Sequence, residues 1–327
     1  MKVAHTAGRR LPADQSGLPP PPCAGREEFT MGGRSTVSDL ISLSLADHVV
    51  ADYVWQLRLP LTASPRPFLH PVRTLTGAEV TELMPEDHPH HLGSVWRSPT
   101  WAGSTSEVVV PLFPAGARWT CATTALNFTR GWVRTTPSSI DHDLRWTGPE
   151  RVDLLHERRT ISAVAVSEVA WALDFSYEMT NVTALPLALA SPATNGRPAA
   201  GYGGFFWRAR RSGRRVEVLG PDRVGVRHLH GSRARWLALV GGGSDAPWSL
   251  VFVPDRGSQQ ADQWFVRHDD YAGVGSSLAW DRPLVLAPGA GIRRRIVTLV
   301  VDGRLRVAQV AGVLSAAEAI LTGAGTG

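Results

Sequence analysis

Four histidines lie between positions 70 and 91, in two short segments, and the second of these also carries the carboxylate of Asp87. In an extended chain His88 and His90 project to one side and His91 to the other, so His88 and His90 can chelate a divalent metal if a third ligand joins them. Alternatively, the imidazoles perform acid–base chemistry or bind a ligand without metal, or they only hydrogen-bond the neighbouring sheet. The candidate catalytic residues in these segments are His70, Asp87, His88 and His91.

A further carboxylate, that of Glu157, lies in the segment Leu-Leu-His-Glu-Arg-Arg-Thr. On a strand His156 and Glu157 point to opposite faces, so one faces the core and the other faces solvent or a cleft. We interpret Glu157 as a catalytic acid–base candidate. The alternative is an ion pair with a neighbouring arginine, Arg158 or Arg159, at the surface.

Two segments in the second half of the chain have the residue types of a substrate-binding site. Gly-Tyr-Gly-Gly-Phe-Phe-Trp-Arg at 201–208 opens with glycines, which allow a tight turn or a close backbone approach. No Lys-Ser/Thr pair follows, so this is not a phosphate loop. The segment 264–271 ends a strand, where a sandwich displays its ligand-binding loops. The predicted substrate-binding residues are Gly203, Gly204, Arg208, Trp264, Arg267 and His268.

Short β-type runs separated by proline and glycine supply the elements that must position these residues. Alternation is clear at 171–179, where Trp171, Leu173, Phe175, Tyr177 and Met179 share one face. Only 306–321 has helical propensity. We therefore predict an all-β fold, an antiparallel β-sandwich of many short strands with a short C-terminal helix. The expected strands are 42–45, 48–59, 66–72, 152–166, 170–181, 203–210, 215–219, 235–240, 248–253, 263–268, 284–286 and 293–301.

Composition limits the partners and the location of the protein. The 327-residue chain has a formal net charge of +5, but Lys2 is the only lysine among 34 basic residues and the arginines are scattered. A nucleic-acid binder gathers its charge on one face, so we expect no nucleic-acid partner. No apolar run reaches the roughly 18 residues of a membrane span, so we expect no membrane partner. Two cysteines cannot build a disulfide framework, which favours a cytoplasmic protein.

The chain divides into three parts. Residues 1–35 are rich in proline and lack an apolar stretch, so we expect a disordered tail or a start codon assigned too early. Residues 36–305 are expected to form a single β-sandwich domain, within which 94–140 is atypical. Residues 306–327 are the C-terminal helix and tail.

Five segments occur in an order that resembles the bacterial PmoA-like family, a domain family of unknown function. They are Arg-Pro-Phe-Leu-His-Pro-Val-Arg-Thr-Leu-Thr-Gly (66–77), Asp-His-Pro-His-His-Leu-Gly (87–93), Gly-Tyr-Gly-Gly-Phe-Phe-Trp-Arg (201–208), Gln-Trp-Phe-Val-Arg (263–267) and Val-Asp-Gly-Arg-Leu (301–305). The resemblance implies a soluble β-sandwich associated with sugar oxidoreductase and carbohydrate-uptake genes. It implies functional positions at His70, Asp87, His88, His91, Gly203, Gly204 and Arg208.

The segment 94–140 departs from that family and lacks coherent strand alternation. When it is back-translated with GC-rich codons and read two bases later, stretches similar to the family reappear. Our hypothesis is a compensated frameshift that opens near Gly93 and closes before about Asp141, and the alternative is a divergent loop insertion. Re-sequencing the gene distinguishes the two.

Three functions fit these observations. The protein acts on or binds a carbohydrate-like small molecule through the histidine-rich site, with a divalent metal as the cofactor that the histidine pattern allows. Alternatively, it is a non-catalytic sugar-binding sandwich module, or a metal-dependent oxidoreductase as the family name suggests. The sequence leaves open whether it is an enzyme.

Overall fold

Alternating side chains along the strands divide the molecule into an inner core and two outer faces. Along β9 (Ala170–Asn181), Trp171, Leu173 and Phe175 belong to the main core, whereas Ala170 and Ala172 belong to a separate cluster on the other side of the strand. This is the two-residue period of a strand buried on both faces. The computed structural model describes residues 24–31, 34–57, 66–83, 94–97, 126–147, 152–211, 215–255 and 262–323.

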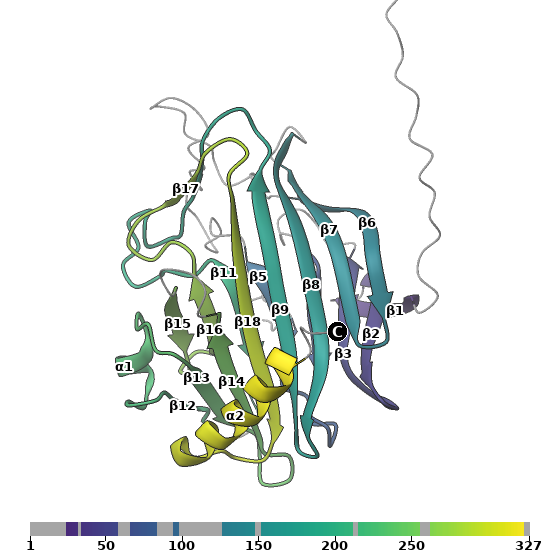
Figure 1. Cartoon of the computed structure of the whole chain (residues 1–327), viewed down its shortest axis with the longest axis vertical. Helices are drawn as coiled ribbons and strands as arrows, with labels where there is room; N and C mark the ends of the chain where they lie inside the picture. Colours follow the sequence, from purple (N-terminus) through teal and green to yellow (C-terminus); the bar gives the residue numbers. More distant parts are fainter. Residues whose placement is uncertain are drawn as a thin grey trace, which may run out of the picture.

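Two eight-stranded antiparallel sheets form the body of the protein (Figure 1). We call them sheet 1 and sheet 2. Sheet 1 runs, in spatial order, β1 (Ala24–Met31), β2 (Arg34–Leu45), β3 (His48–Leu57), β4 (Phe68–Val72), β5 (Ser94–Arg97), β11 (Gly204–Ala209), β16 (Ala272–Ser277) and β15 (Gln263–Arg267).

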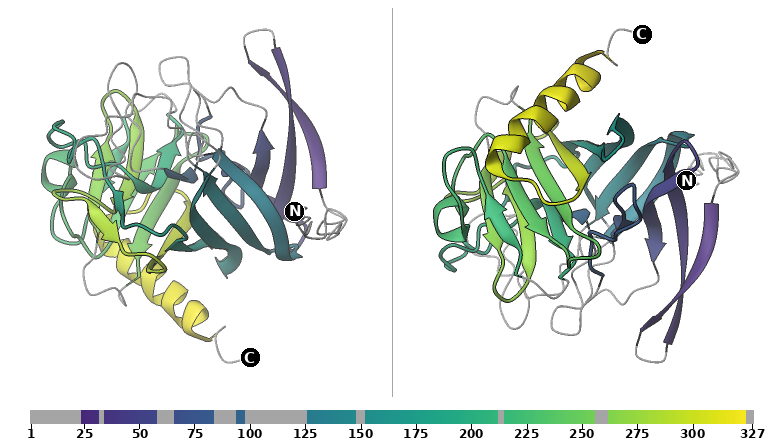
Figure 2. Two further views of the ribbon diagram at one scale, coloured as in Figure 1. Left: turned by 90° about the horizontal axis from the view of Figure 1, so that it is seen from above. Right: turned by 90° about the horizontal axis from the view of Figure 1, so that it is seen from below.

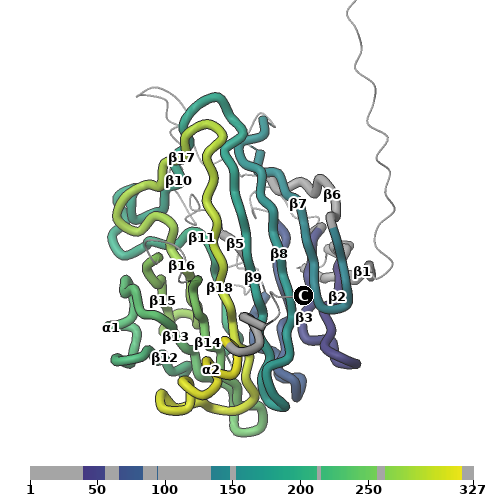
Figure 3. The backbone as a smooth tube through the Cα atoms, viewed as in Figure 1, coloured from purple at the N-terminus to yellow at the C-terminus, as the bar shows by residue number. Residues whose placement is uncertain are grey.

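Sheet 2 contains the longest of the described strands, β8 (Asp153–Ser167), and Figure 3 traces it side by side with β9 and β18 (Gly291–Asp302). Its order is β12 (Glu217–Leu219), β13 (Leu237–Gly241), β14 (Trp248–Pro254), β18 (Gly291–Asp302), β9, β8 (Asp153–Ser167), β7 (Ser139–Thr147) and β6 (Leu126–Thr136). A small pair joins β10 (Leu187–Leu189) to β17 (Leu284–Leu286). The described residues also form two helices, α1 (Val226–Leu229) and α2 (Val307–Gly323).

The main core lies between the two sheets. Leu69 and Trp207 of sheet 1 and Phe175 and Leu250 of sheet 2 belong to one buried cluster. Burying a large apolar side chain contributes about 1.5–3 kcal/mol, so this layer is the principal source of stability. The predicted antiparallel β-sandwich with a C-terminal helix is therefore confirmed.

The outer faces of the two sheets are covered differently. On sheet 2, Val310 and Ala317 of α2 join a cluster with Ala172, Val251 and Leu299, and Figure 2 shows the helix on that side. On sheet 1, the outer face carries a cluster rich in aromatic rings. Its buried members are Leu40, Val54, Phe68, Ala200, Tyr202, Phe206, Phe265 and Tyr271, with Leu83 and Trp280 packed against them.

Six strands among the described residues lie outside the expected ones: β1, β5, β6, β7, β10 and β16. Ala24–Met31 form β1, paired with β2, in a region predicted to be a tail. The Gly32-Gly33 pair between the two runs is a hairpin signal that accounts for this pairing. The strand β16 was missed because its sequence, Ala-Gly-Val-Gly-Ser-Ser, is typical of a loop, since glycine is depleted in strands.

Both ends of the atypical segment 94–140 lie in strands. Ser94–Arg97 form β5, which pairs with β11, and β6 pairs with β7. Residues 98–125 lie outside the described residues, so the frameshift hypothesis stays a prediction about the gene. Among the described residues, no helix is long and apolar enough to cross a membrane.

Candidate functional site

Two glycines of β16 organise the outer face of sheet 1. Gly273 pairs with Arg208 on β11 and with Arg267 on β15. Gly275 pairs in the same way with Phe206 and Phe265. Cross-strand partners lie on the same face of a sheet. Arg208, Gly273 and Arg267 therefore lie side by side across the three strands. Phe206, Gly275 and Phe265 lie side by side in the same way, two residues further along. The two arginine backbones are roughly 10 Å apart, because neighbouring strands are spaced by about 4.8 Å.

The ring of Tyr271 occupies the space above Gly273. A Cβ built on Gly273 would lie 2.8 Å from Cε2 of this ring, so only glycine leaves room for it. The guanidinium carbon of Arg208 lies 4.5 Å from the centroid of the Tyr271 ring, and that of Arg267 lies 4.6 Å from the centroid of the Phe265 ring. These are cation–π distances. We call Phe206, Arg208, Phe265, Arg267 and Tyr271 the arginine–aromatic face.

A carboxylate reaches this face from the segment that follows β4. The Nε of Arg208 donates to Oε2 of Glu82 at 2.6 Å, and the backbone N–H of Glu82 donates to the carbonyl of Arg208 at 3.1 Å. Thr81 forms a β-bridge with Ala209, which holds Glu82 beside β11. The side chain of Glu82 is 27% exposed whereas that of Arg208 is 2% exposed, so Glu82 is the partner that a ligand can reach.

His70 lies in a half-buried position beside Thr81, the residue that precedes Glu82. Its Nδ1 is 2.9 Å from Oγ1 of Thr81, and the same oxygen accepts a hydrogen bond from the N–H of Val72 at 3.0 Å. Burial, reinforced by the charges of Arg73 and Arg210, lowers the pKa of His70 to about 4. The imidazole is therefore neutral at pH 7.

The opposite end of the face is closed by His230, which follows α1. The N–H of Val266 donates to its Nδ1 at 3.1 Å, so its Nε2 carries the proton and donates to the carbonyl of Ala199 at 3.0 Å. Burial and the charge of Arg267 lower the pKa of His230. Its ring stacks edge-on against Phe265 and Trp280, at centroid distances of 5.3 and 4.9 Å. A neutral imidazole thus lies against Phe265 at this end of the arginine–aromatic face.

The predicted glycines at the start of β11 hold that strand in position. Gly204 has φ of +113°, and a Cβ there would lie 2.5 Å from the carbonyl oxygen of Ser276. Gly203 accepts a hydrogen bond from the N–H of Leu278 at 2.9 Å. Gly204 therefore allows a close approach of two backbones, and Gly203, with φ of +152°, has a backbone conformation that favours glycine.

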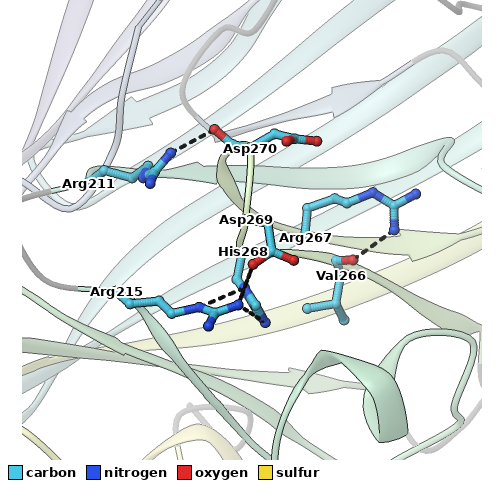
Figure 4. Close-up of polar contacts among 7 residues, drawn as sticks. All are labelled: Arg211, Arg215, Val266, Arg267, His268, Asp269 and Asp270. Carbon is cyan, nitrogen blue, oxygen red and sulfur yellow. Dashed lines mark hydrogen bonds and ion pairs between the residues drawn. The ribbon is translucent and has the colours of Figure 1, made fainter.

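Arg267 and His268 are adjacent in sequence but point to different places, as Figure 4 shows. Arg267 donates to the carbonyls of Val266 and Ala199 at 3.2 and 3.4 Å. His268 instead lies near Asp269 and Arg215, with Nδ1 2.9 Å from a carboxylate oxygen of Asp269. His268 belongs to this separate surface cluster, and we leave it out of the candidate site.

Two other predicted residues lie between the sheets. Trp264 is 1% exposed and its Nε1 donates to the carbonyl of Ala234 at 2.8 Å. Glu157 is also 1% exposed, and it accepts from Nε of Arg159 at 2.7 Å and from Nε1 of Trp146 at 2.8 Å. Neither side chain reaches the arginine–aromatic face, so we leave both out of the candidate site.

Glu157 belongs to a buried polar network that joins the two sheets. Arg159 also donates to Oη of Tyr53 and to the carbonyl of Pro67, both at 3.3 Å. Oη of Tyr53 is 2.9 Å from Nδ1 of His142. Burial raises the pKa of Tyr53 to about 12 and lowers that of His142 to about 3. These shifts keep Tyr53 and His142 neutral, so the charged members of the network are Glu157 and Arg159.

The remaining sequence candidates cannot be placed. Asp87, His88, His90 and His91 lie outside the described residues, so their catalytic and metal-binding roles stay predictions. Within the part of the chain that is described, no group of three or more His, Cys, Asp or Glu side chains is arranged to hold a metal ion.

Comparison with known proteins identifies the family. A family model, described as a family of unknown function (DUF6807), matches residues 41–315. The chain belongs to DUF6807. The expected membership of a PmoA-like family is wrong, because the model that matches is that of DUF6807. No curated protein matches the chain.

One solved structure with a similar outline is the GalM/aldose epimerase homologue from C. elegans. It has 9% sequence identity and a TM-score of 0.38, and the alignment covers 86% of this chain and 100% of that one.

Sequence reasoning missed the residues that complete the site: Thr81, Glu82, Phe265, Tyr271 and His230. A usable signal existed at 264–267, where the two-residue period places Phe265 and Arg267 on one face and Trp264 on the other. The sequence offered no signal for Glu82, because its approach to Arg208 depends on a single bridge between Thr81 and Ala209.

Proposed function

We propose that the protein binds a polyhydroxylated, carbohydrate-like small molecule on the outer face of sheet 1. The observation that carries this proposal is the placement of Arg208 and Arg267 on either side of Gly273, with Tyr271 between them. The Arg267 guanidinium offers directed N–H donors, and the Glu82 carboxylate, which Arg208 holds in place, offers acceptors. Rings beside such polar groups suit a ligand that has both hydroxyl groups and apolar C–H surfaces.

The groups at the rim would make the contacts. His70, Glu82, Arg267, His230 and Trp280 are all partly exposed, whereas the aromatic rings behind them are nearly covered. A ligand would therefore hydrogen-bond to the rim and lay its apolar side against Trp280.

The protonation of His70 favours binding over acid–base catalysis by this residue. A general base works best when its pKa lies near the working pH, and a pKa of about 4 makes His70 a weak proton acceptor at pH 7. A neutral imidazole is a good hydrogen-bond partner for a hydroxyl group. We therefore assign His70 a binding role, and Asp87, His88 and His91 stay candidates for any proton transfer. The cytoplasmic location and a metal at His88 and His90 are likewise part of the proposal.

Saturation-transfer NMR with a panel of neutral and acidic monosaccharides tests the proposal. We expect at least one sugar to receive saturation from the wild-type protein. Arg267→Gln should weaken its binding about 10-fold, the effect of losing one hydrogen bond from a charged donor. Arg282→Gln is the matched control, since Arg282 is exposed and lies outside the arginine–aromatic face.

The outcomes are distinguishable. Loss of binding in Arg267→Gln with unchanged binding in Arg282→Gln supports the proposal. Equal affinities for wild type and Arg267→Gln place the sugar elsewhere and contradict it, as does the absence of any binding sugar in the panel.

A further inference from the structure

A groove with a different chemistry is lined by residues of the turn after β12, of α1 and of the segment after that helix. Figure 1 labels α1 and β12. Its volume is about 430 Å³, within the usual range for small-molecule sites. The lining includes Arg223, Arg233, Arg235 and His228, against a single acidic side chain, that of Asp222. Positive charge is therefore concentrated along the walls of the groove.

Two of these arginines have no competing partner. Arg223 and Arg235 are exposed, and within the described part of the chain their guanidiniums make no hydrogen bond or ion pair. Arg233 donates to Oε1 of Gln263 at 3.1 Å, which holds it at the rim. Free guanidiniums on one concave surface repel one another unless an anion lies between them.

Backbone contacts fix both walls of the groove. On one wall, the N–H of Gly220 donates to the carbonyl of Arg223 at 2.9 Å, and a Cβ on Gly220 would lie 2.5 Å from Cδ2 of Leu229. This close approach packs the turn against α1. On the other wall, the N–H of Trp264 donates to the carbonyl of Ser232 at 2.8 Å. The arginines therefore extend from backbone that is already in place, which lowers the entropic cost of binding.

We propose that this groove binds a small molecule that carries a phosphate group. The planar guanidinium fork matches phosphate oxygens, and several arginines around one cavity suit a doubly charged group. Apart from His228, the lining holds no ring on which a nucleobase can stack, which argues against single-stranded nucleic acid. This inference uses none of the residues of the arginine–aromatic face, so it is independent of the function proposed above.

Isothermal titration with inorganic phosphate and with glycerol 3-phosphate, at constant ionic strength, tests this site. We expect saturable binding by the wild type. The double variant Arg223→Gln/Arg235→Gln should weaken it by about 30-fold or more, because two charge-assisted hydrogen bonds are lost. The control Arg282→Gln/Arg306→Gln removes the same net charge from exposed positions elsewhere and should change the affinity by less than about 2-fold.

All four arginines are exposed, so both double variants should retain the wild-type melting temperature, which is checked first. Three results overturn the proposal. They are equal weakening in both double variants, succinate binding as tightly as phosphate, and the absence of saturable phosphate binding by the wild type. Tighter binding of a single-stranded oligonucleotide through the same arginines also overturns it, because the recognised partner would then be nucleic acid.

Discussion

Arg208 and Arg267 lie opposite the same residue, Gly273, on the two strands that flank β16. Each guanidinium stacks on an aromatic ring, Arg208 on Tyr271 and Arg267 on Phe265. A side chain at position 273 would separate the two arginines and displace the Tyr271 ring. The glycine strand therefore creates the candidate site, although it carries none of the site's functional groups.

Replacing Glu82 by glutamine should weaken the site and lower stability modestly. The change removes the charge that neutralises Arg208, whose side chain is 2% exposed. Because Glu82 is itself 27% exposed, we expect a loss of about 1–2 kcal/mol in the free energy of unfolding rather than the larger cost of a fully buried pair. Urea denaturation measures it, with Glu178→Gln on an exposed position of β9 as the control. A loss no larger than that of the control would mean that the ion pair contributes nothing.

The free energy of unfolding should fall as the pH is lowered from about 6.5 to about 4. The folded-state pKa of His70 lies at about 4, below its usual value of 6.5, so the unfolded chain binds more protons in this window. The stabilisation is present above pH 6.5 and is lost as the pH approaches 4; for His70 it is on the order of 3 kcal/mol. His142, with a pKa of about 3, acts in the same direction.

Denaturation curves at several pH values test this expectation. His70→Gln should flatten the dependence, whereas His48→Gln, at an exposed hairpin position, should leave it unchanged. A slope that is identical in wild type and His70→Gln would show that His70 titrates normally.

Removing Glu157 should destabilise the fold and leave sugar binding intact in the protein that remains folded. Glu157→Ala leaves the Arg159 guanidinium buried without its carboxylate, which costs about 3–5 kcal/mol. Tyr53→Phe removes only one hydrogen-bonding group of the same network and should cost about 1–2 kcal/mol. Both are measured by urea denaturation. If Glu157→Ala kept the wild-type stability but lost sugar binding, Glu157 would have a role in ligand binding rather than in the fold.

A methyl group at position 204 should disturb the start of β11. Gly204→Ala combines a φ of +113° with a Cβ 2.5 Å from the Ser276 carbonyl, and we expect a cost of about 3 kcal/mol. Gly303→Ala is the matched control, because Gly303 has φ of +90° and no atom within 4 Å of the added Cβ, so it should cost about 1 kcal/mol. Equal costs at the two positions would show that the close approach to Ser276 is unimportant.

The sequence predicted the sandwich well because its strands have strong local signals. The alternation along β9 and the apolar runs of β13 and β14 predict both the strands and the burial of their side chains. The site was harder to predict, because it depends on which strands become neighbours. Arg208 and Arg267 were both selected from sequence, but only the pairing of β16 with β11 and β15 brings them to one face. Trp264 and Glu157 were selected for their chemistry. The two-residue period separates Trp264 from Arg267, but which face of a strand lies between the sheets depends on how the strands pair.

The most direct test of the proposed function is a crystal structure of the protein soaked with the tightest-binding sugar from the panel. If the proposed function is correct, we expect electron density for the sugar against Arg267, Glu82 and His70, on the outer face of sheet 1. Density for the sugar at any other surface, with this face empty, would contradict it.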